Sequence, residues 1–332
     1  MRCEASAPGK VIIGGEHWVV HGGTAVAAAI GLRARAICEP VEGGMGVVIE
    51  TMFGAARLEQ DRVTGAREAA PLARAVQAVA EALGVQPVPA RCRVESSIPP
   101  GAGLGSSAAT AVAAAAAYAA LLLGGERPPL DAVNSAAYEA EKITHGRPSG
   151  IDNTVSTFGG FLAYRRGEKP RLLSSKPADA TLYIVDTGVP RSTRRAVETF
   201  TSNLSLLGSI NNLSTLLINL AEETTRSMIQ AIESGDVDRL GALMYLAHGL
   251  LNAMGVSHSR IEEAVHTARA RGALGAKLTG AGMGGTVIVL CRGQTCGQVA
   301  SALMEKGYNP IPAALGAEGV RITCTNGREP RQ

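Results

Sequence analysis

Several familiar signatures are missing from this sequence. It holds no Gly-x-x-x-x-Gly-Lys-Ser/Thr motif, which excludes a Walker-type phosphate loop. Aromatic residues make up 3% of the chain, and its Lys and Arg residues are scattered rather than gathered in a basic block, so we expect no nucleic-acid partner. The N-terminus shows no charged leader with an apolar stretch and a cleavage site, which favours a cytoplasmic location.

Long apolar runs and cysteine motifs are also scarce. The uncharged stretch 107–123 is short for a membrane span and consists mostly of alanine, so we expect a buried helix there and no membrane contact. The chain has no Cys-x-x-Cys pair and no regular cysteine spacing. We therefore expect its six cysteines to be small apolar residues in a reducing cytoplasm, without disulfides or a zinc site: Cys3, Cys38, Cys92, Cys291, Cys296 and Cys324.

What the sequence does contain is a glycine-rich segment, Pro99-Pro100-Gly101-Ala102-Gly103-Leu104-Gly105-Ser106-Ser107, followed directly by an alanine-rich run. Its backbone amides carry few side chains that could cover them, and the alanine run favours a helix. A helix N-terminus offers unpaired N–H groups and the positive end of the helix dipole, so it binds phosphate well. Taken alone, the segment fits a nucleotide phosphate site and a tight turn before a buried helix equally well.

A second glycine cluster, Thr279-Gly280-Ala281-Gly282-Met283-Gly284-Gly285, contains a Gly-x-Gly-x-x-Gly match. A dinucleotide-binding loop would open a helix, but the β-branched run 286–290 that follows predicts a strand. We therefore predict a glycine loop between two strands that approaches another part of the site closely.

The 332 residues fit two domains or one large domain with a core of alanine, valine and leucine. Alternating apolar residues predict strands at 3–13, 24–38, 47–51, 90–96, 160–164, 181–186 and 320–325, besides the pair that flanks the second glycine cluster. Helical patterns cover 68–83, 108–123, 130–144, 203–233, 236–254, 259–271 and 296–306. The stretch 146–153 is rich in turn residues, and 165–180 is the expected seam between domains.

Three glycine-bearing segments follow one another in a specific order. They are Ala7-Pro8-Gly9-Lys10 through Gly15-Glu16-His17, then Pro100 to Ala108, then Leu278 to Gly285, with Pro148-Ser149-Gly150-Ile151-Asp152-Asn153-Thr154 between the second and the third. This set resembles the superfamily of galactokinases, homoserine kinases, mevalonate kinases and phosphomevalonate kinases. Within it, the segments 7–22, 145–160 and 189–193 are most similar to the mevalonate kinase family, and the resemblance spans residues 5 to about 290. Two positions depart from the family pattern: Met283 stands where a glycine is usual, and Gly14 where a bulky residue is frequent.

The resemblance implies an α+β fold of two domains. An N-terminal β/α domain, residues 1–175, would carry the glycine-rich phosphate loop and the catalytic aspartate, and a ferredoxin-like C-terminal domain, residues 176–332, would carry the third glycine loop. ATP and mevalonate would meet in the cleft between them, and the γ-phosphoryl group would pass to the 5-hydroxyl of mevalonate, an early step of isoprenoid synthesis. The sequence does not fix the oligomeric state, and a homodimer is compatible with it.

The same resemblance implies roles for two charged residues. Asp152 would accept or orient the proton of the substrate hydroxyl, and Lys10 would neutralise charge beside it and beside the transferring phosphoryl group. Judged from the residues alone, Asp152 also fits an aspartate that serves a turn, and Lys10 a solvated surface group.

By the same resemblance, the second segment would bind ATP and, together with Glu141, Mg²⁺. Ser107 and Glu141 would be the magnesium ligands, although Ser106 is an alternative to Ser107. Glu139 is the competing carboxylate, but a residue two positions away points elsewhere on a helix. The residues expected to bind ATP and its phosphates are Pro100, Gly101, Ala102, Gly103, Leu104, Gly105, Ser106, Ser107, Ala108 and Gly282.

Four residues map to the substrate side by resemblance: Glu16, His17, Thr193 and Ala281. His17 would form a hydrogen bond with a carboxylate or hydroxyl of mevalonate. A single histidine is more often structural, and we expect a structural role for His21, His248, His258 and His266.

Two alternatives remain at this point. The first is a sister kinase: galactokinases are less similar, because Glu16-His17 is followed by Trp-Val-Val-His-Gly and not by Thr-Asp-Tyr, but basic residues that a substrate phosphate would require are present at Arg147, Arg191, Arg194 and Arg195. The second is a ligand sensor on a kinase fold, which predicts a damaged site. The presence of Lys10, Glu141, Asp152 and both serines argues against it.

Overall fold

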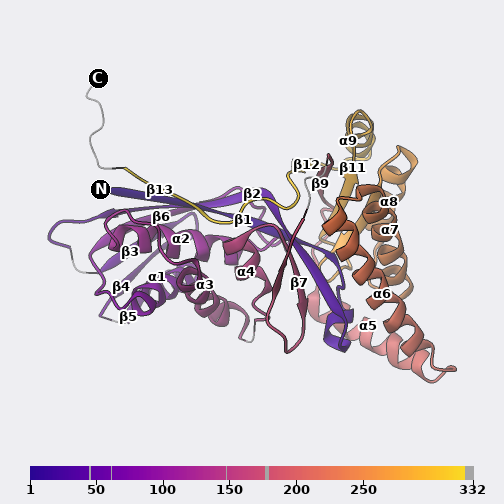
Figure 1. Ribbon diagram of the computed structural model, residues 1–332, viewed down its shortest axis with the longest axis horizontal. Helices are drawn as coiled ribbons and strands as arrows, with labels where there is room; N and C mark the ends of the chain where they lie inside the picture. Colours follow the sequence, from indigo (N-terminus) through magenta and orange to yellow (C-terminus); the bar gives the residue numbers. More distant parts are fainter. Residues whose placement is uncertain (45, 61, 147, 176–178, 326–332) are drawn as a thin grey trace.

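The computed structural model describes residues 1–44, 46–60, 62–146, 148–175 and 179–325. The molecule is elongated, with a unit of strands and helices at one end and a unit dominated by helices at the other (Figure 1). Two long strands near the N-terminus run from the first unit towards the helices of the second (Figure 1).

Nine strands of the described residues form the first sheet: β1 (Arg2–Gly14), β2 (Thr24–Pro40), β3 (Val47–Thr51), β4 (Gly54–Glu59), β5 (Arg62–Gly65), β6 (Ala90–Ser96), β7 (Phe161–Arg165), β8 (Arg171–Leu173) and β13 (Arg321–Thr325). The main order is β13-β1-β2-β6-β3-β4-β5, while β7 pairs with β2 and β8. The β3–β6 pair is parallel, and the other pairs are antiparallel.

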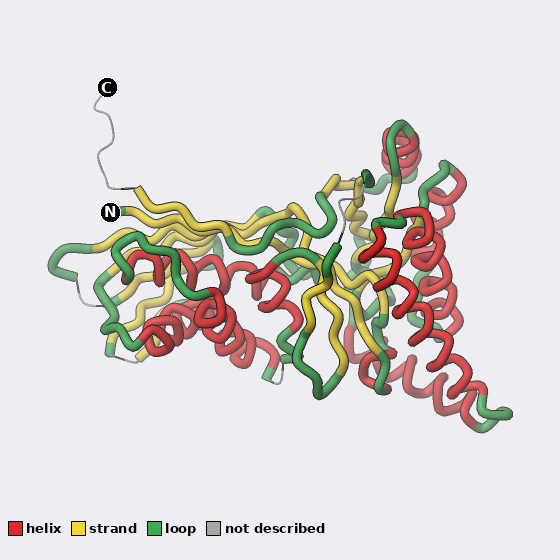
Figure 2. Tube along the Cα trace, in the orientation of Figure 1, coloured by secondary structure: helices red, strands yellow, loops and turns green. Residues whose placement is uncertain are grey.

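Helices cover one side of this sheet (Figure 2). They are α1 (Ala70–Leu83), α2 (Ser106–Leu122), α3 (Leu130–His145) and α4 (Ile151–Phe158), with the short 3₁₀ turns η1 (Trp18–His21) and η2 (Arg67–Ala69). The alanine-rich α2 is the central helix, because it is buried along nearly its whole length between the sheet and its helical neighbours. Alanine side chains are small enough to let these neighbours approach closely, so the core needs few aromatic residues.

The second unit has a four-stranded sheet in the described part of the chain. Its order is β10-β11-β9-β12, with every neighbouring pair antiparallel. Its elements are β9 (Thr181–Asp186), α5 (Thr193–Gly208), α6 (Leu213–Ser234), α7 (Val237–Ala253), α8 (Ser259–Ala270), β10 (Gly275–Thr279), β11 (Thr286–Cys291), α9 (Thr295–Glu305) and β12 (Pro310–Ala313). The expected α+β architecture of two units is confirmed.

Most predicted elements are confirmed, and two differ in an instructive way. The single helix predicted over 203–233 is split into α5 and α6, because Asn211 and Asn212 adopt positive φ angles of 46° and 60° that end the helix. Only the end of the turn-rich stretch 146–153 differs: residues 151–153 form the first turn of α4, which begins after Gly150 at a φ of 81°. Four short strands, β4, β5, β8 and β12, have too little alternation to be predicted.

The prediction for the cysteines is wrong, because the structure pairs all six in disulfides: Cys3–Cys324, Cys38–Cys92 and Cys291–Cys296. The register of β13, β1, β2 and β6 places Cys324, Cys3, Cys38 and Cys92 directly opposite one another in one row across four strands. Facing residues of antiparallel strands come close enough for a disulfide, with both Cα–Cα distances in this row at 4.1 Å. Sequence spacing does not reveal such neighbours.

The C-terminal strand β13 returns to the first sheet and pairs with β1. The domain boundary predicted between residues 175 and 176 touches residues 176–178, which lie outside the described residues, and it stays a prediction. No helix in the described part of the chain combines the length and apolarity needed to cross a bilayer.

Candidate active site

The glycine-rich segment forms a loop that leads directly into α2. Gly101, Gly103 and Gly105 have φ angles of 73°, 79° and 73°, a region that side chains other than glycine rarely adopt. The first strand packs directly against this loop, because the Lys10 N–H donates to the Leu104 carbonyl at 2.8 Å. A Cβ at Gly9 would come within 2.7 Å of the same carbonyl oxygen, so this close approach requires the glycine before Lys10.

Lys10 and Asp152 form an ion pair at this loop. Lys10 projects from β1 and Asp152 from the first turn of α4, and Lys10 Nζ lies 3.4 Å from Asp152 Oδ1. The lysine side chain is 10% exposed and the aspartate side chain 33% exposed, so the carboxylate remains accessible to a ligand. The structure thus brings together the two residues expected to be catalytic.

Glu141 and Ser107 meet beside this pair. Glu141 lies on α3, is 3% exposed and accepts a hydrogen bond from the Ser107 hydroxyl at the start of α2. Burial raises the pKa of Glu141, and the Asp152 charge raises it further, while the Ser107 hydroxyl, His145 and Lys10 act in the opposite direction. Ser106 contacts a different side chain, because its Oγ lies 3.3 Å from Ser96 Oγ.

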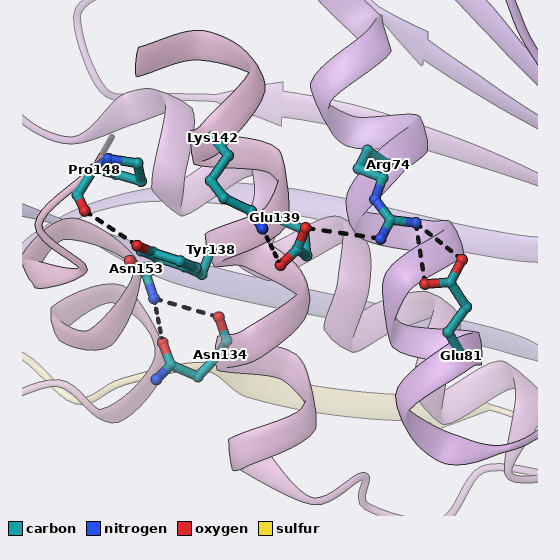
Figure 3. Close-up of polar contacts among 8 residues, drawn as sticks. All are labelled: Arg74, Glu81, Asn134, Tyr138, Glu139, Lys142, Pro148 and Asn153. Carbon is teal, nitrogen blue, oxygen red and sulfur yellow. Dashed lines mark hydrogen bonds and ion pairs between the residues drawn. The ribbon is translucent and has the colours of Figure 1, made fainter. Parts of the chain in front are cut away.

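Glu139, the competing carboxylate, faces away from the phosphate loop. Figure 3 shows it between Lys142 and Arg74, with ion-pair distances of 2.6 Å and 3.8 Å. On the other side of α3, the Asn153 amide next to Asp152 donates to Asn134 Oδ1 at 2.6 Å, and Tyr138 donates to the Pro148 carbonyl at 3.3 Å (Figure 3). These bonds fix α4 against α3, and with it the position of Asp152.

Three of the four residues expected on the substrate side, Glu16, His17 and Ala281, form a second group where the chain after β1 meets the β10–β11 hairpin. His17 Nε2 lies 2.8 Å from the Ala281 carbonyl, and the imidazole stacks on Phe200 at a centroid distance of 4.7 Å. Burial lowers the pKa of His17, although the Ala281 carbonyl and Glu16 act against that shift. Thr193 is the exposed first residue of α5.

The third glycine loop is tightly packed. A Cβ at Gly282 would come within 2.1 Å of the Val256 carbonyl. Met283, where the family usually has glycine, keeps a positive φ of 56° and donates its N–H to the same carbonyl at 2.7 Å. A Cβ at Gly14 would lie 2.5 Å from Met228 Sδ, so a larger side chain there would require the Met228 side chain to move. Neither departure from the family pattern removes a chemical group from the site.

Two basic side chains lie within the site. Sequence reasoning named Arg191 only as a candidate for a substrate phosphate in a sister kinase, and it did not name Lys277. A Cβ on Gly103 would lie 2.0 Å from Arg191 Nη1, and one on Gly280 would lie 3.4 Å from that atom, so the guanidinium lies between the two glycine loops. Lys277, on β10, is fully buried and forms an ion pair with Glu16. The sequence feature that could have revealed Lys277 is a single charged residue within an otherwise apolar strand. Arg147, a third basic candidate, lies outside the described residues.

A cavity of about 950 Å³ opens beside the phosphate loop. Part of its wall comes from the loop and its neighbours, including Pro100, Gly101, Ser106, Ser107 and Glu141. The opposite wall comes from the β3–β4 turn and the start of α1, a region that the sequence did not mark as functional: Thr51, Met52, Phe53, Arg67, Glu68, Pro71 and Leu72. The volume lies in the range of a small-molecule or cofactor site.

Family comparisons agree with this architecture. The family model described as GHMP kinases N terminal domain matches residues 71–160, and the one described as GHMP kinases C terminal matches residues 228–309. The first match contains the phosphate loop, Glu141 and Asp152, and the second contains Lys277 and the third glycine loop. Fold and site therefore have the features of a GHMP kinase.

Individual relatives narrow the assignment. A mevalonate kinase of Aeropyrum pernix is 42% identical over 322 residues, which cover 96% of this chain and 97% of the relative. A mevalonate kinase of Thermococcus sibiricus is 36% identical over 97% of this chain and 98% of its own length. The crystal structure of L. major mevalonate kinase in complex with R-mevalonate superposes with a TM-score of 0.76 at 26% identity, covering 94% of this chain and 95% of that one. The chain belongs to the mevalonate kinase family of the GHMP kinases.

Proposed function

We propose that this chain transfers the γ-phosphoryl group of ATP to the 5-hydroxyl of mevalonate and so forms 5-phosphomevalonate in the mevalonate pathway of isoprenoid biosynthesis. The observation that carries the proposal is the Lys10–Asp152 ion pair next to the Ser107–Glu141 contact at the mouth of the phosphate loop. Phosphoryl transfer consists mostly of positioning and charge neutralisation, and these four side chains supply the groups that it needs.

Asp152 is the proposed acceptor of the substrate proton. Its carboxylate is partly exposed and is held from one side by Lys10, so the substrate hydroxyl can approach an oxygen that is already oriented. Lys10 stabilises the negative charge that develops between this carboxylate and the transferring phosphoryl group. Because the Lys10 N–H is bonded to the loop at Leu104, the ammonium and the phosphates keep a fixed relation to each other.

The residues beside the loop fit a magnesium ion. Ser107 and Glu141 offer a hydroxyl and a carboxylate, which are hard oxygen ligands, and a bound cation would favour the ionised form of the buried Glu141. Within the described residues, no three His, Cys, Asp or Glu side chains lie together in a way that could hold a metal ion. Mg²⁺ would therefore reach the site with ATP and, once bound, would neutralise the charge of the phosphates. Ser106, which faces Ser96, would support the phosphates instead.

The cavity beside the loop is the proposed place of the nucleotide base and ribose. Pro100, Gly101, Ala102, Gly103, Leu104, Gly105, Ser106, Ser107, Ala108 and Gly282 remain the proposed contacts to ATP and its phosphates. Mevalonate would lie on the other side of Asp152, against Glu16, His17, Thr193 and Ala281. Because His17 Nε2 donates to the Ala281 carbonyl, Nδ1 of the neutral imidazole would accept from a mevalonate hydroxyl, and the Arg191 guanidinium is the donor available to the carboxylate.

The test is ADP release from MgATP by the purified protein with mevalonate, phosphomevalonate, galactose or homoserine as acceptor. We expect turnover with mevalonate alone and 5-phosphomevalonate as the product. Turnover with phosphomevalonate alone would reassign Arg191 and its basic neighbours to a substrate phosphate. Absence of turnover with all four acceptors would refute the proposed reaction.

The remaining part of the proposal concerns location and assembly. We place the protein in the cytoplasm, with ATP and mevalonate as its small-molecule partners. Sedimentation velocity on the purified chain decides between a monomer and the homodimer with which the sequence is compatible.

A further inference from the structure

The backbone makes an unusual turn at Glu16-His17-Trp18. His17 has a φ of 62° and a ψ of −46°, and the Trp18 N–H donates to the Glu16 carbonyl at 2.7 Å. This is a γ-turn with a positive φ at its central residue, a form that is rare and strained in proteins. A non-glycine residue keeps such a conformation only where its surroundings hold it there.

Three contacts hold this turn, and two of them come from one hairpin. Lys277 on β10 donates to Glu16 Oε1 and, at 2.6 Å, to the Leu278 carbonyl. The Ala281 carbonyl in the β10–β11 loop is the partner of His17 Nε2. Phe200 of α5, which also belongs to the second unit, stacks on the imidazole of His17. The side chains of Glu16 and His17 are thus each fixed to the β10–β11 hairpin.

The polar side chains on one face of β10 bond to the end of β1 and to the turn that follows it. Residues two apart on a strand share a face, so Lys277 and Thr279 point to the same side. Thr279 Oγ1 accepts from the Ile12 N–H at 2.9 Å and donates to the Ile12 carbonyl at 3.1 Å. The neighbour on the opposite face, Leu278, packs into the apolar core of the second unit. Lys277 therefore belongs to the contact surface between β10 and the chain around Glu16.

A lysine in this place is costly. Lys277 has no exposed surface, and burial lowers its pKa while Glu16 acts in the opposite direction. An apolar side chain of similar volume would fill the same space without the cost of desolvating an ammonium and a carboxylate. The ion pair is thus a poor choice for stability alone, but it fixes the direction of Glu16 in a way that an apolar contact does not.

We propose that Lys277 is a positioning residue for the substrate site: its buried ion pair with Glu16 holds the strained turn and thereby aims the His17 imidazole at mevalonate. The inference rests on the proposed function for the identity of the ligand. The turn itself can be observed independently of turnover, because Trp18, which closes it, is the only tryptophan in the sequence and is buried.

The experiment is Lys277→Met, which leaves Glu16 and His17 in place. We expect KM for mevalonate to rise by about tenfold, which corresponds to about 1.4 kcal/mol of lost binding, with KM for MgATP little changed. The emission of Trp18 should shift to longer wavelength as the turn relaxes and the indole leaves its contact with Phe200. An unchanged KM for mevalonate together with unchanged emission would overturn the proposal.

Two further variants separate positioning from folding. Val79→Ala, in the α1 part of the first unit's core and outside the cluster that contains Trp18, should lower Tm while leaving KM for mevalonate and the Trp18 emission at wild-type values. The double variant E16Q/K277M removes the unpaired buried carboxylate, so it remains folded if Lys277→Met alone does not. Measured against E16Q, the double variant should still show the shifted emission; emission equal to that of E16Q would overturn the proposal. If the wild type does not use mevalonate, the emission data still test the turn, whereas the proposed function fails separately.

Discussion

Replacing Glu141 by glutamine should change stability in opposite directions with and without nucleotide. Without ligand, the carboxylate is 3% exposed, and burial together with the Asp152 charge disfavours its ionised form. Glutamine keeps the shape and the acceptor for Ser107 but has no charge. We therefore expect Glu141→Gln to be more stable than the wild type when no nucleotide is bound.

The magnitude follows from the size of such effects. The Ser107 hydroxyl and Lys10 offset part of the burial of the charge, so the effect should be near the centre of the range for single substitutions. We expect a gain of about 1 kcal/mol in the free energy of unfolding, or about 2 °C in Tm for a chain of this size. With MgATP at about 100 times its Kd, binding adds about 2.7 kcal/mol to the wild type. Loss of a magnesium ligand should weaken the affinity for Mg²⁺ by about 10–100-fold. MgATP therefore stabilises the variant much less than it stabilises the wild type.

The pH dependence has a defined sign. A carboxyl whose pKa is raised in the folded state binds its proton more tightly when folded, so its contribution to stability is full below the ordinary value of 4.5 and is lost as the pH rises through the raised pKa. The extra stability of Glu141→Gln over the wild type should therefore increase as the pH rises through that window.

The assay is thermal unfolding of both proteins across this pH range, without nucleotide and with saturating MgATP. Glu139→Gln is the matched control, since it lies two positions away on α3 and pairs with Lys142 and Arg74 outside the loop. The order of the two melting temperatures should reverse on adding MgATP for Glu141→Gln and not for Glu139→Gln. A variant that is less stable in both conditions, with a wild-type Mg²⁺ response, would refute the assignment of Glu141.

Other predictions concern the reacting carboxylate, the loop and the disulfides. Asp152→Asn should lower kcat by about 10²–10⁴-fold, because it removes the proton acceptor, while calorimetry shows ATP binding retained. Gly103→Ala should raise KM for ATP, since its Cβ meets Arg191 at 2.0 Å and its φ is 79°. Reduction of Cys3–Cys324 and Cys38–Cys92 should lower the free energy of unfolding by about 2–4 kcal/mol for each disulfide, measured by denaturation with and without reductant.

Each of these has an outcome that contradicts it. Turnover by Asp152→Asn at the wild-type rate would remove the residue from the reaction. An unaltered KM in Gly103→Ala would mean that the loop does not bind phosphate in this conformation. Identical unfolding curves in the presence and absence of reductant would show that the cysteine row contributes nothing to stability.

The parts of the molecule that the sequence predicts are those governed by local chemistry. The strand at 90–96 and the alanine helix after the phosphate loop follow from alternation and composition, and the structure places them at Ala90–Ser96 and Ser106–Leu122. Lys10, Glu141 and Asp152 were predicted because they stand in motifs, and the structure places them beside one another at the loop. The disulfides were missed because pairing depends on the register of strands as distant as β13 and β1, which no local pattern encodes.

Lys277 was missed for a related reason, and it shows how the site is assembled. One strand, β1, touches the phosphate loop at Lys10, and two residues later Ile12 bonds to Thr279 of the other unit. After β1 ends, Glu16 reaches Lys277. The same short segment therefore carries the ammonium that faces Asp152 and the contacts that join the two units. Because both are built on one backbone, a change in how β10 lies against β1 must move the phosphate side and the substrate side together, and mutations at this seam should alter catalysis without touching a reacting atom.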